Sequence, residues 1–171
     1  MVFDWVLVGK SIPLLGTGLI TTLKISSLAM LIGLALGGHW GSHLCRVSLR
    51  CAALRWFVRE YVDFIRGTPL LIQNFLVYFA LPVVDINLPE FWASVIALSL
   101  NAAGFLAEIV RAGIGSIEKG QTEAARSIGM RHHQILFHVL LPQSLRSVVP
   151  PATNEMITLV NGSALLSVIS V

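Results

Sequence analysis

The stretch Ile12–Gly38 reads IPLLGTGLITTLKISSLAMLIGLALGG and decides the fold class of this chain. Lys24 is its only charged residue, and the stretch exceeds the roughly 20 residues of helix that cross a bilayer. Lipid offers no hydrogen-bond partners, so the backbone of such a stretch must bond to itself, as it does in a helix. The stretch therefore predicts a transmembrane helix.

The remainder of the chain is similarly apolar. Of the 171 residues, 55% are hydrophobic and only 12% are charged, which exceeds what a soluble core needs. Gly67–Val84 and Phe91–Ala107 are expected to span the membrane with help from their charged flanks. Leu140–Val171 is interrupted by prolines and amides, and we expect it to hold a fourth span and the start of a fifth element. No segment alternates like a barrel strand, so the predicted fold is an all-α membrane protein with about four to five transmembrane helices.

Positive charge predicts which side of the membrane each connection faces. Basic residues gather between the first two spans and after the third: Arg46, Arg50, Arg55 and Arg59, then Arg111, Lys119, Arg126, Arg131 and Arg146. Because lysine and arginine are enriched in cytoplasmic loops, we expect both regions inside the cell and the N-terminus outside. In this prediction residues 1–15 are a periplasmic segment and residues 113–141 form a cytoplasmic loop.

The cytoplasmic loop carries the sequence GQTEAARSIGMRHHQILFHVLLP over residues 120–142. Its first part favours helix, and Gly129 suits the left-handed position just after a helix end. We predict two short helices joined at this glycine.

This loop resembles the cytoplasmic signature of ABC importer permease subunits, the inner-membrane components of binding-protein-dependent transport. The matching residues are Glu123, Ala124, Ala125, Gly129, Val139, Leu140, Leu141 and Pro142, with valine in place of the usual isoleucine. Further stretches are similar to permeases for polar amino acids: YVDFIRGTPLLIQ (61–73), AEIVRAGI (107–114), LPQSLRSVVPPATNE (141–155) and LLSVISV (165–171). The resemblance implies an ABC transmembrane type-1 domain over residues 16–171.

The resemblance implies a transport subunit and not an enzyme. Such permeases lie in the bacterial inner membrane as homo- or heterodimers with two copies of an ABC ATPase subunit, and a periplasmic solute-binding protein delivers the amino acid. No GxxxxGK[ST] phosphate loop occurs in this chain, so ATP is expected to be hydrolysed by the partner. No cofactor and no nucleic-acid partner is expected. The residues expected to couple to the ATPase are Gly120, Glu123, Ala124, Ala125, Gly129 and Pro142. In this resemblance the small side chains of Ala124 and Ala125 would let the helix sit closely in a groove of the ATPase, to which Glu123 offers a charge.

Polar side chains within the predicted spans are candidates for the substrate path, because they are costly in lipid and usually face a partner or a cavity. These candidates are Asn101, Asn154, Asn161 and Lys24. Uncharged amides can hydrogen-bond a zwitterion without trapping it, whereas Lys24 is equally well explained by snorkelling to the interface. The family carries a lysine where this chain has Asn161, which leaves the charge class of the substrate open.

A further set of residues predicts a gate or a packing contact. Arg59 and Asp63, and Asp63 and Arg66, have helical spacings just before the proline at position 69, so each pair is expected to form an ion pair. Interfacial anchoring is the favoured explanation of these residues, and a gate or inter-subunit contact at the proline kink is the alternative. Glu108 and Arg111 are expected to form a structural pair. The gate or packing candidates are Arg66, Pro69, Glu108 and Arg111.

Two other patterns carry little functional weight. The histidines at positions 39, 43, 132, 133 and 138 have no acidic or thiolate residue at fitting spacing, so no metal site is predicted. Gly33 and Gly37 form a GxxxG pattern, which packing within one subunit explains as well as dimerisation does.

Two alternatives to an ATP-driven importer stay open. The charged Lys24 and Glu108 in the spans are compatible with an ATP-independent channel or secondary transporter. The permeases that this chain resembles run on for another pair of helical segments, so we expect a C-terminally truncated domain. A truncated, non-transporting paralogue is the second alternative.

Overall fold

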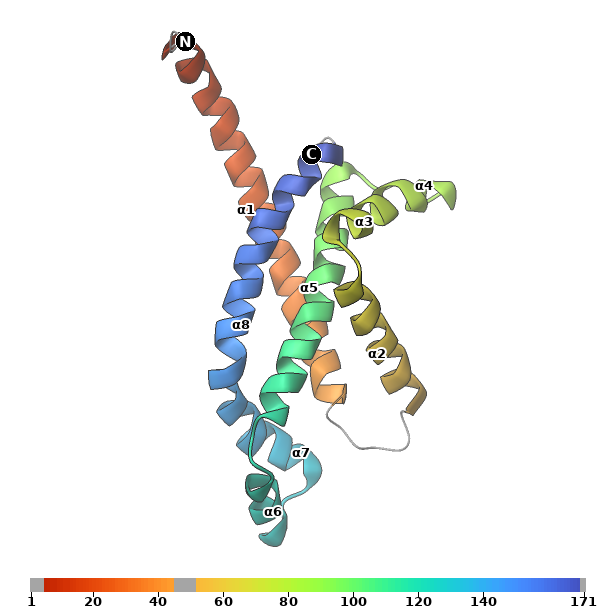
Figure 1. Cartoon of the computed structure of the whole chain (residues 1–171), viewed down its shortest axis with the longest axis vertical. Helices are drawn as coiled ribbons and strands as arrows, with labels where there is room; N and C mark the ends of the chain where they lie inside the picture. Colours follow the sequence, from red (N-terminus) through yellow and green to blue (C-terminus); the bar gives the residue numbers. More distant parts are fainter. Residues whose placement is uncertain (1–4, 45–51, 170–171) are drawn as a thin grey trace.

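A computed structural model describes residues 5–44 and 52–169, and every regular element in this part is a helix (Figure 1). The α-helices are α1 (Trp5–Leu44), α2 (Ala52–Gly67), α3 (Leu70–Phe75), α4 (Leu81–Val83), α5 (Glu90–Gly115), α6 (Lys119–Ser127), α7 (His132–Gln134) and α8 (Leu141–Gly162). Leu76–Ala80 (η2) and Ile135–Leu140 (η3) are π-helical, and Ser163–Ile169 (η4) is a 3₁₀-helix. The predicted all-α fold is confirmed. Arg46 and Arg50 of the predicted cytoplasmic region, and residues 1–4, lie outside the described residues.

α5 is the central helix, with α1, α2 and α8 arranged around it (Figure 1). The main core lies where α1, α5 and α8 meet, and its fully buried side chains include Ile25, Leu98, Leu106 and Leu159. α1 begins, and α8 ends, at the end of the molecule opposite to α6 (Figure 1). Which side of the membrane each end faces stays a prediction.

Glycines on one face of α1 allow it to approach α5 closely. Gly33, Gly37 and Gly41 recur every four residues, so they line a single face. A Cβ atom added to Gly33 would lie 2.5 Å from the Cβ of Ala102, and one added to Gly37 would lie 2.7 Å from the Cβ of Leu106. Side chains at these positions would collide with α5. Packing within the subunit therefore accounts for the GxxxG pattern.

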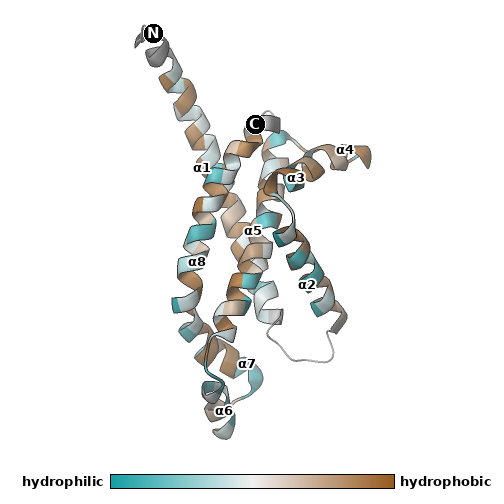
Figure 2. Ribbon diagram, viewed as in Figure 1, coloured by the Kyte–Doolittle hydropathy of each residue, from teal (hydrophilic) through white to brown (hydrophobic). Residues whose placement is uncertain are grey.

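α1 and α5 are the two described helices that are both long and apolar enough to cross a membrane, through Ser11–Ser42 and Glu90–Gly115. α2 and the helices that follow it to Val83 meet the same test only as a pair bent by 113°. α8 has 22 residues and is long enough to span, since a helix rises about 1.5 Å per residue, but it is more polar. Figure 2 shows this contrast between the polar stretches of α8 and the apolar α3 and α4.

Prolines do not interrupt the helix that leads into α8. Pro142 is the second residue of α8, which follows the π-helical η3. Pro82 is the second residue of α4, which follows the π-helical η2. The proline ring clashes with the carbonyl four residues earlier, and a wider π turn relieves that clash. The second helix of the predicted pair therefore continues through Pro142 rather than ending there.

Candidate functional site

The predicted coupling segment contains α6, a short helix at the end of the molecule beyond α5 (Figure 1). Its end is closed by two hydrogen bonds: the Gly129 N–H donates to the Arg126 carbonyl at 2.9 Å, and the Met130 N–H donates to the Ala125 carbonyl at 3.2 Å. This is a Schellman motif, and its φ of +81° at Gly129 is left-handed, a conformation that glycine adopts without strain. The prediction of a helix that ends at Gly129 is confirmed.

One face of α6 is fastened to its own subunit. Ala125 is only 5% exposed and belongs to a cluster with Ile114 of α5 and with Ile135, Leu136 and Leu140 of η3. Its small side chain therefore fits α6 against η3 and the end of α5. This inward role differs from the predicted one, in which both alanines face a partner.

The opposite face of α6 is open. Gly120, Glu123 and Ala124 are exposed, and among the described residues the Glu123 carboxylate has no hydrogen bond or ion pair. Ile128, at the C-terminal end of the helix, is 78% exposed, although it is a large apolar side chain. The sequence analysis missed Ile128. The available signal was an apolar residue in an otherwise polar segment, directly before the turning glycine.

The base of α8 connects α6 to the bundle. A Cβ atom at Gly113 of α5 would overlap the side chain of Val148 of α8, so these helices are in close contact. The hydroxyls of Ser116 and Ser147 are 3.3 Å apart across the same junction. α6, η3 and the adjoining ends of α5 and α8 thus form one packed unit, which we call the α6 unit.

The bend between α2 and α3 is stabilised by buried amides. Pro69 is the N-cap of α3, and the Gln73 amide donates to the Ile65 carbonyl at 2.8 Å and to the Thr68 hydroxyl at 2.8 Å. The amide of Asn101 in α5 donates in turn to the Gln73 Oε1 atom at 2.9 Å. These bonds satisfy backbone groups that the break in the helix leaves free, and they attach the bend to α5. Gln73 is a structural residue that the sequence analysis did not single out.

An ion cluster joins α2 to α5 close to the bend. Arg111 donates to both carboxylate oxygens of Glu108, at 2.7 and 2.6 Å, which confirms the predicted pair. Arg66 of α2 lies 3.6 Å from the same carboxylate. Arg59 and Asp63 also form the predicted pair, at 3.9 Å, but no ion pair between Asp63 and Arg66 occurs in the described part of the chain.

The four residues predicted for the substrate path do not meet in one site. Asn101 is 5% exposed and bonded to Gln73, whereas Lys24 is exposed on α1. Asn154 and Asn161 are exposed on α8, and their separation of seven residues places them on one face. No hydrogen bond or ion pair joins any two of the four within residues 5–44 and 52–169.

Three buried polar side chains have atoms without a hydrogen-bond partner in the described structure: Ser26 (its Oγ atom), Asn74 and Glu155. Both polar atoms of the Asn74 amide lack a hydrogen-bond partner, although the residue is 1% exposed, and so does Oε1 of the buried Glu155 in α8. Buried polar groups are paired in most proteins, so such atoms point to water or to a ligand. None of the three residues is among the site candidates predicted from the sequence.

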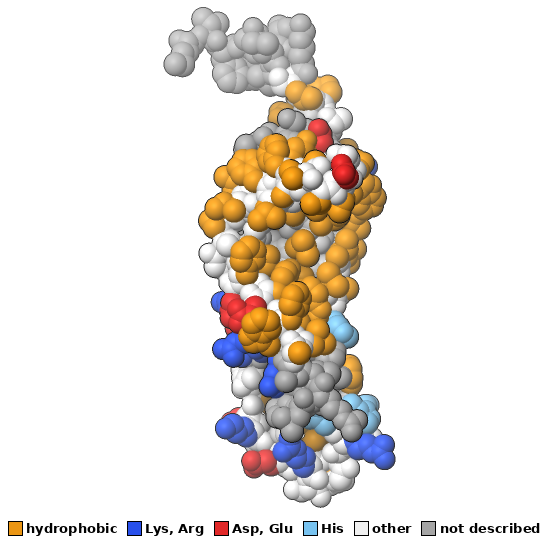
Figure 3. Space-filling view, turned by 90° about the vertical axis from the view of Figure 1, so that its right-hand side faces the viewer, with side chains coloured by type: hydrophobic (Ala, Val, Ile, Leu, Met, Phe, Trp, Pro, Cys, Tyr) orange, Lys and Arg blue, Asp and Glu red, His pale blue; other side chains and the backbone are white. Residues whose placement is uncertain are grey.

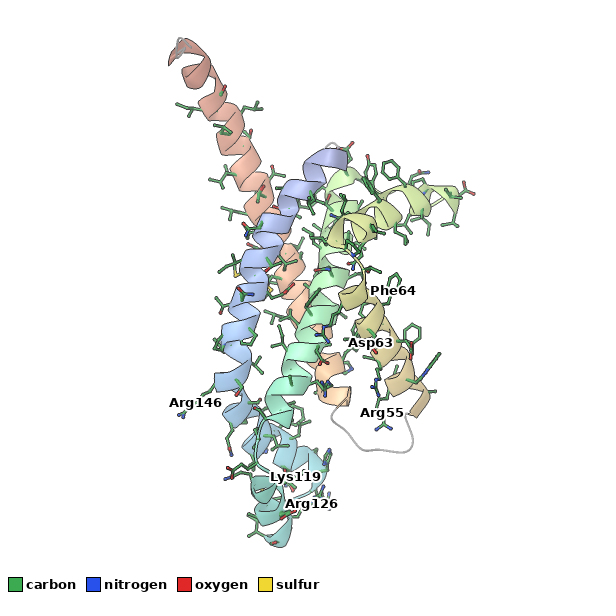
Figure 4. All side chains as sticks on the ribbon, viewed as in Figure 1. Arg55, Asp63, Phe64, Lys119, Arg126 and Arg146 are labelled. Carbon is green, nitrogen blue, oxygen red and sulfur yellow. The ribbon has the colours of Figure 1, made fainter. Side chains whose placement is uncertain are left out.

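The surface divides into an apolar and a charged region. Figure 3 shows hydrophobic side chains over much of the face formed by α2 and its neighbours, with arginine, lysine and histidine gathered toward the α6 end. Lys119 and Arg126 lie at that end (Figure 4). In the described part of the chain, no group of three or more His, Cys, Asp or Glu residues is arranged to hold a metal ion.

Comparison with known proteins places this architecture in a family. Residues 29–170 match the family described as binding-protein-dependent transport system inner membrane component. The chain is 42% identical over 159 residues to the arginine transport system permease protein ArtQ of Bacillus subtilis (strain 168), covering 92% of this chain and 71% of ArtQ. It is 40% identical over 168 residues to the L-cystine transport system permease protein TcyB of the same organism, covering 98% of this chain and 70% of TcyB.

The fold is similar to that of a solved transporter. A chain from a structure described as the crystal structure of an amino acid ABC transporter with histidines superimposes with a TM-score of 0.89 at 38% sequence identity. The match covers 100% of this chain and 78% of that chain. Sequence and fold agree, and this chain belongs to the family of binding-protein-dependent transport system inner membrane components, the permease subunits of ABC transporters.

Proposed function

We propose that this chain moves polar amino acids across the bacterial inner membrane as one permease half of an ATP-driven importer, with its N-terminus outside. The names of its relatives, which refer to arginine and L-cystine transport, support the substrate class. In this proposal residues 16–171 belong to the transmembrane domain, and residues 113–141 form the loop that couples it to the ATPase.

The observation that carries the proposal is the two-sided form of α6. Ala125 and Gly129 fix the helix to its own subunit, while Glu123, Ala124 and Ile128 stay open to a partner. The small Ala124 side chain near the exposed Ile128 side chain suits insertion of α6 into a groove on a partner protein. The Glu123 carboxylate suits basic residues at the edge of that groove. A helix that only connected α5 to α8 would need no exposed isoleucine.

The α6 unit supplies a route for coupling. Because α6 is packed against η3 and the ends of α5 and α8, a force on α6 moves those helices together. Closure of two ATPase subunits would then rock two permease halves between outward-facing and inward-facing states.

The polar face of α8 is the proposed lining of the path. Asn154 and Asn161 would be costly in lipid, so a second permease subunit with water between the halves is the environment that suits them. A periplasmic binding protein would deliver the amino acid at the outer end. Asn101 and Lys24 stay predictions for the path.

Reconstitution tests the proposal. The chain would be assembled in proteoliposomes with the ATPase and binding protein encoded beside it, and ATP hydrolysis and amino-acid uptake would be measured together. We expect the amino acid with its binding protein to stimulate both. Failure to form a stable complex with any ATPase subunit would refute the proposal, and uptake that needs no ATPase would favour a channel or secondary transporter.

A further inference from the structure

A cavity of 620 Å³ lies between α2 and α5, and no residue of α6 or α8 lines it. Its lining residues are Arg55, Trp56, Arg59, Val62, Asp63, Glu108 and Arg111, and we call it the basic pocket. Three of the five charged residues are arginines, and Arg66 lies against Glu108 beside them. The pocket therefore carries a surplus of positive charge.

The acidic residues of the pocket do not neutralise all of its arginines. Glu108 is held by Arg111 through two hydrogen bonds, and Asp63 lies 3.9 Å from Arg59 in a pair exposed to solvent. Such an exposed pair contributes little free energy and is easily exchanged. Arg55 has no hydrogen bond or ion pair among the described residues. The Arg55 guanidinium is therefore available to an anion. One guanidinium group can bind two oxygens of a phosphate group through two parallel hydrogen bonds.

The position of the pocket indicates which anion reaches it. Beside the pocket α2 exposes three large aromatic side chains, Trp56, Phe57 and Phe64, each more than half exposed. In Figure 3 the apolar surface ends where charged side chains begin, and in Figure 4 Arg55 lies on α2 nearer that charged end than Phe64 does. Tryptophan and arginine at such a boundary are typical of the membrane interface. A ligand with a phosphate group and apolar chains matches both surfaces.

We propose that the basic pocket binds the headgroup phosphate of an anionic phospholipid of the cytoplasmic leaflet, with Arg55 and Arg59 as the phosphate ligands. The acyl chains lie along Trp56 and the neighbouring aromatic side chains of α2. Basic pockets between transmembrane helices on the cytoplasmic side have the chemistry that such headgroups need. A free phosphate ion shares the headgroup chemistry, but it gives the aromatic side chains no partner.

Native mass spectrometry of the full chain in a neutral detergent tests this proposal. Phosphatidylglycerol and phosphatidylcholine would be titrated onto the wild type, Arg55→Gln, and Arg55→Gln combined with Arg59→Gln. Arg146→Gln is the matched control, because Arg146 is also exposed but lies on α8, across the molecule from Arg55 (Figure 4). We expect phosphatidylglycerol to bind more tightly than phosphatidylcholine. Its affinity should fall about fivefold for each pocket arginine removed and stay unchanged in the control.

A competition experiment distinguishes binding of a lipid headgroup phosphate from binding of a free phosphate ion. Inorganic phosphate in large excess should leave phosphatidylglycerol bound if the acyl chains contribute to binding. Complete displacement would assign the pocket to a soluble anion and overturn the lipid proposal. Equal affinities of the two lipids for the wild type, or equal losses in the Arg55→Gln and Arg146→Gln variants, would also overturn it. An unaltered thermal unfolding midpoint would exclude misfolding as the cause of a loss.

Discussion

The interior around α5 and the short helix α6 both contain small residues at close contacts, but the contacts differ. On α1, Gly33 and Gly37 let two helices of the same subunit approach closely. On α6, Ala125 faces the subunit while Ala124 beside it faces away. A small residue in a sequence thus signals a close approach, and only the structure tells what approaches it.

The two regions also differ in the burial and hydrogen bonding of their polar side chains. Around α5 the Asn101 and Gln73 amides are buried and bonded to each other, so they stabilise the bend next to Pro69. On α6 the Glu123 carboxylate is exposed and available to another protein. We therefore expect mutations around α5 to change stability, and mutations on the outer face of α6 to change coupling while leaving stability intact.

The largest effect is expected from Gly37→Leu. A Cβ atom there would lie 2.7 Å from the Leu106 Cβ and 2.8 Å from the Ala103 carbonyl oxygen, so α1 and α5 would have to separate. Overpacking of this kind costs about 3 kcal/mol of unfolding free energy. Gly38→Leu is the matched control, since no atom lies within 4 Å of its Cβ position. Equal midpoints of thermal unfolding in detergent for the two variants would contradict the claim that the close approach of α1 to α5 at Gly37 determines stability.

Asn101→Leu should be the next most damaging change. It leaves the Gln73 Oε1 atom buried without its donor, which costs about 2 kcal/mol. Asn154→Leu replaces an exposed amide on α8 and should leave the unfolding midpoint unchanged while reducing amino-acid uptake. Measuring both quantities for both variants separates a structural amide from one in the path. A fall in uptake with normal stability for Asn101→Leu would instead assign Asn101 to the path.

Gly129→Leu forces a branched side chain into a left-handed conformation, which costs roughly 1–2 kcal/mol within the α6 unit. We expect membrane insertion to persist and substrate-stimulated ATP hydrolysis to fall strongly, because the Schellman motif orients α6. Gly115→Leu is the control, since that glycine has open space around it and no positive φ. Identical rates of ATP hydrolysis in the Gly129→Leu and Gly115→Leu variants would contradict the claim that the turn at Gly129 orients α6 for coupling.

The smallest effect on stability is expected from a pair of changes on α6. Ala125→Leu enlarges a buried side chain and should cost about 1 kcal/mol, the lower end of overpacking, because the partly buried Met130 beside it is flexible. Ala124→Leu should leave stability unchanged and weaken co-purification of the ATPase. If the two variants exchanged these phenotypes, the assignment of inner and outer faces would be reversed.

Much of the fold was predictable because apolar runs and helix-end signals act locally. The helices α1 and α5 follow from the lengths of their apolar stretches, and the end of α6 follows from Gly129. The bend at Pro69 was predictable as a kink. Its angle of 113° was not, because it depends on a contact between Gln73 and Asn101, which are distant in sequence.

The site was less predictable than the fold for the same reason. The signature residues of the loop share one short segment, but the inward face of Ala125 depends on Ile114 and Ile135, which come from other elements. The continuation of the helix through Pro142 depends on the π turn before it. The candidates for the path lie on separate helices, and no local pattern indicates which of them share a surface.

The central claim is that the outer face of α6 couples this permease to an ATPase. Glu123→Arg tests it most directly, because it reverses the charge of an exposed side chain that has no described partner and should not disturb the fold. Substrate-stimulated ATP hydrolysis would be measured on the reconstituted complex beside the wild type and Arg146→Gln. We expect loss of stimulation in Glu123→Arg alone, with normal membrane insertion. Stimulation at the wild-type level in Glu123→Arg would contradict it.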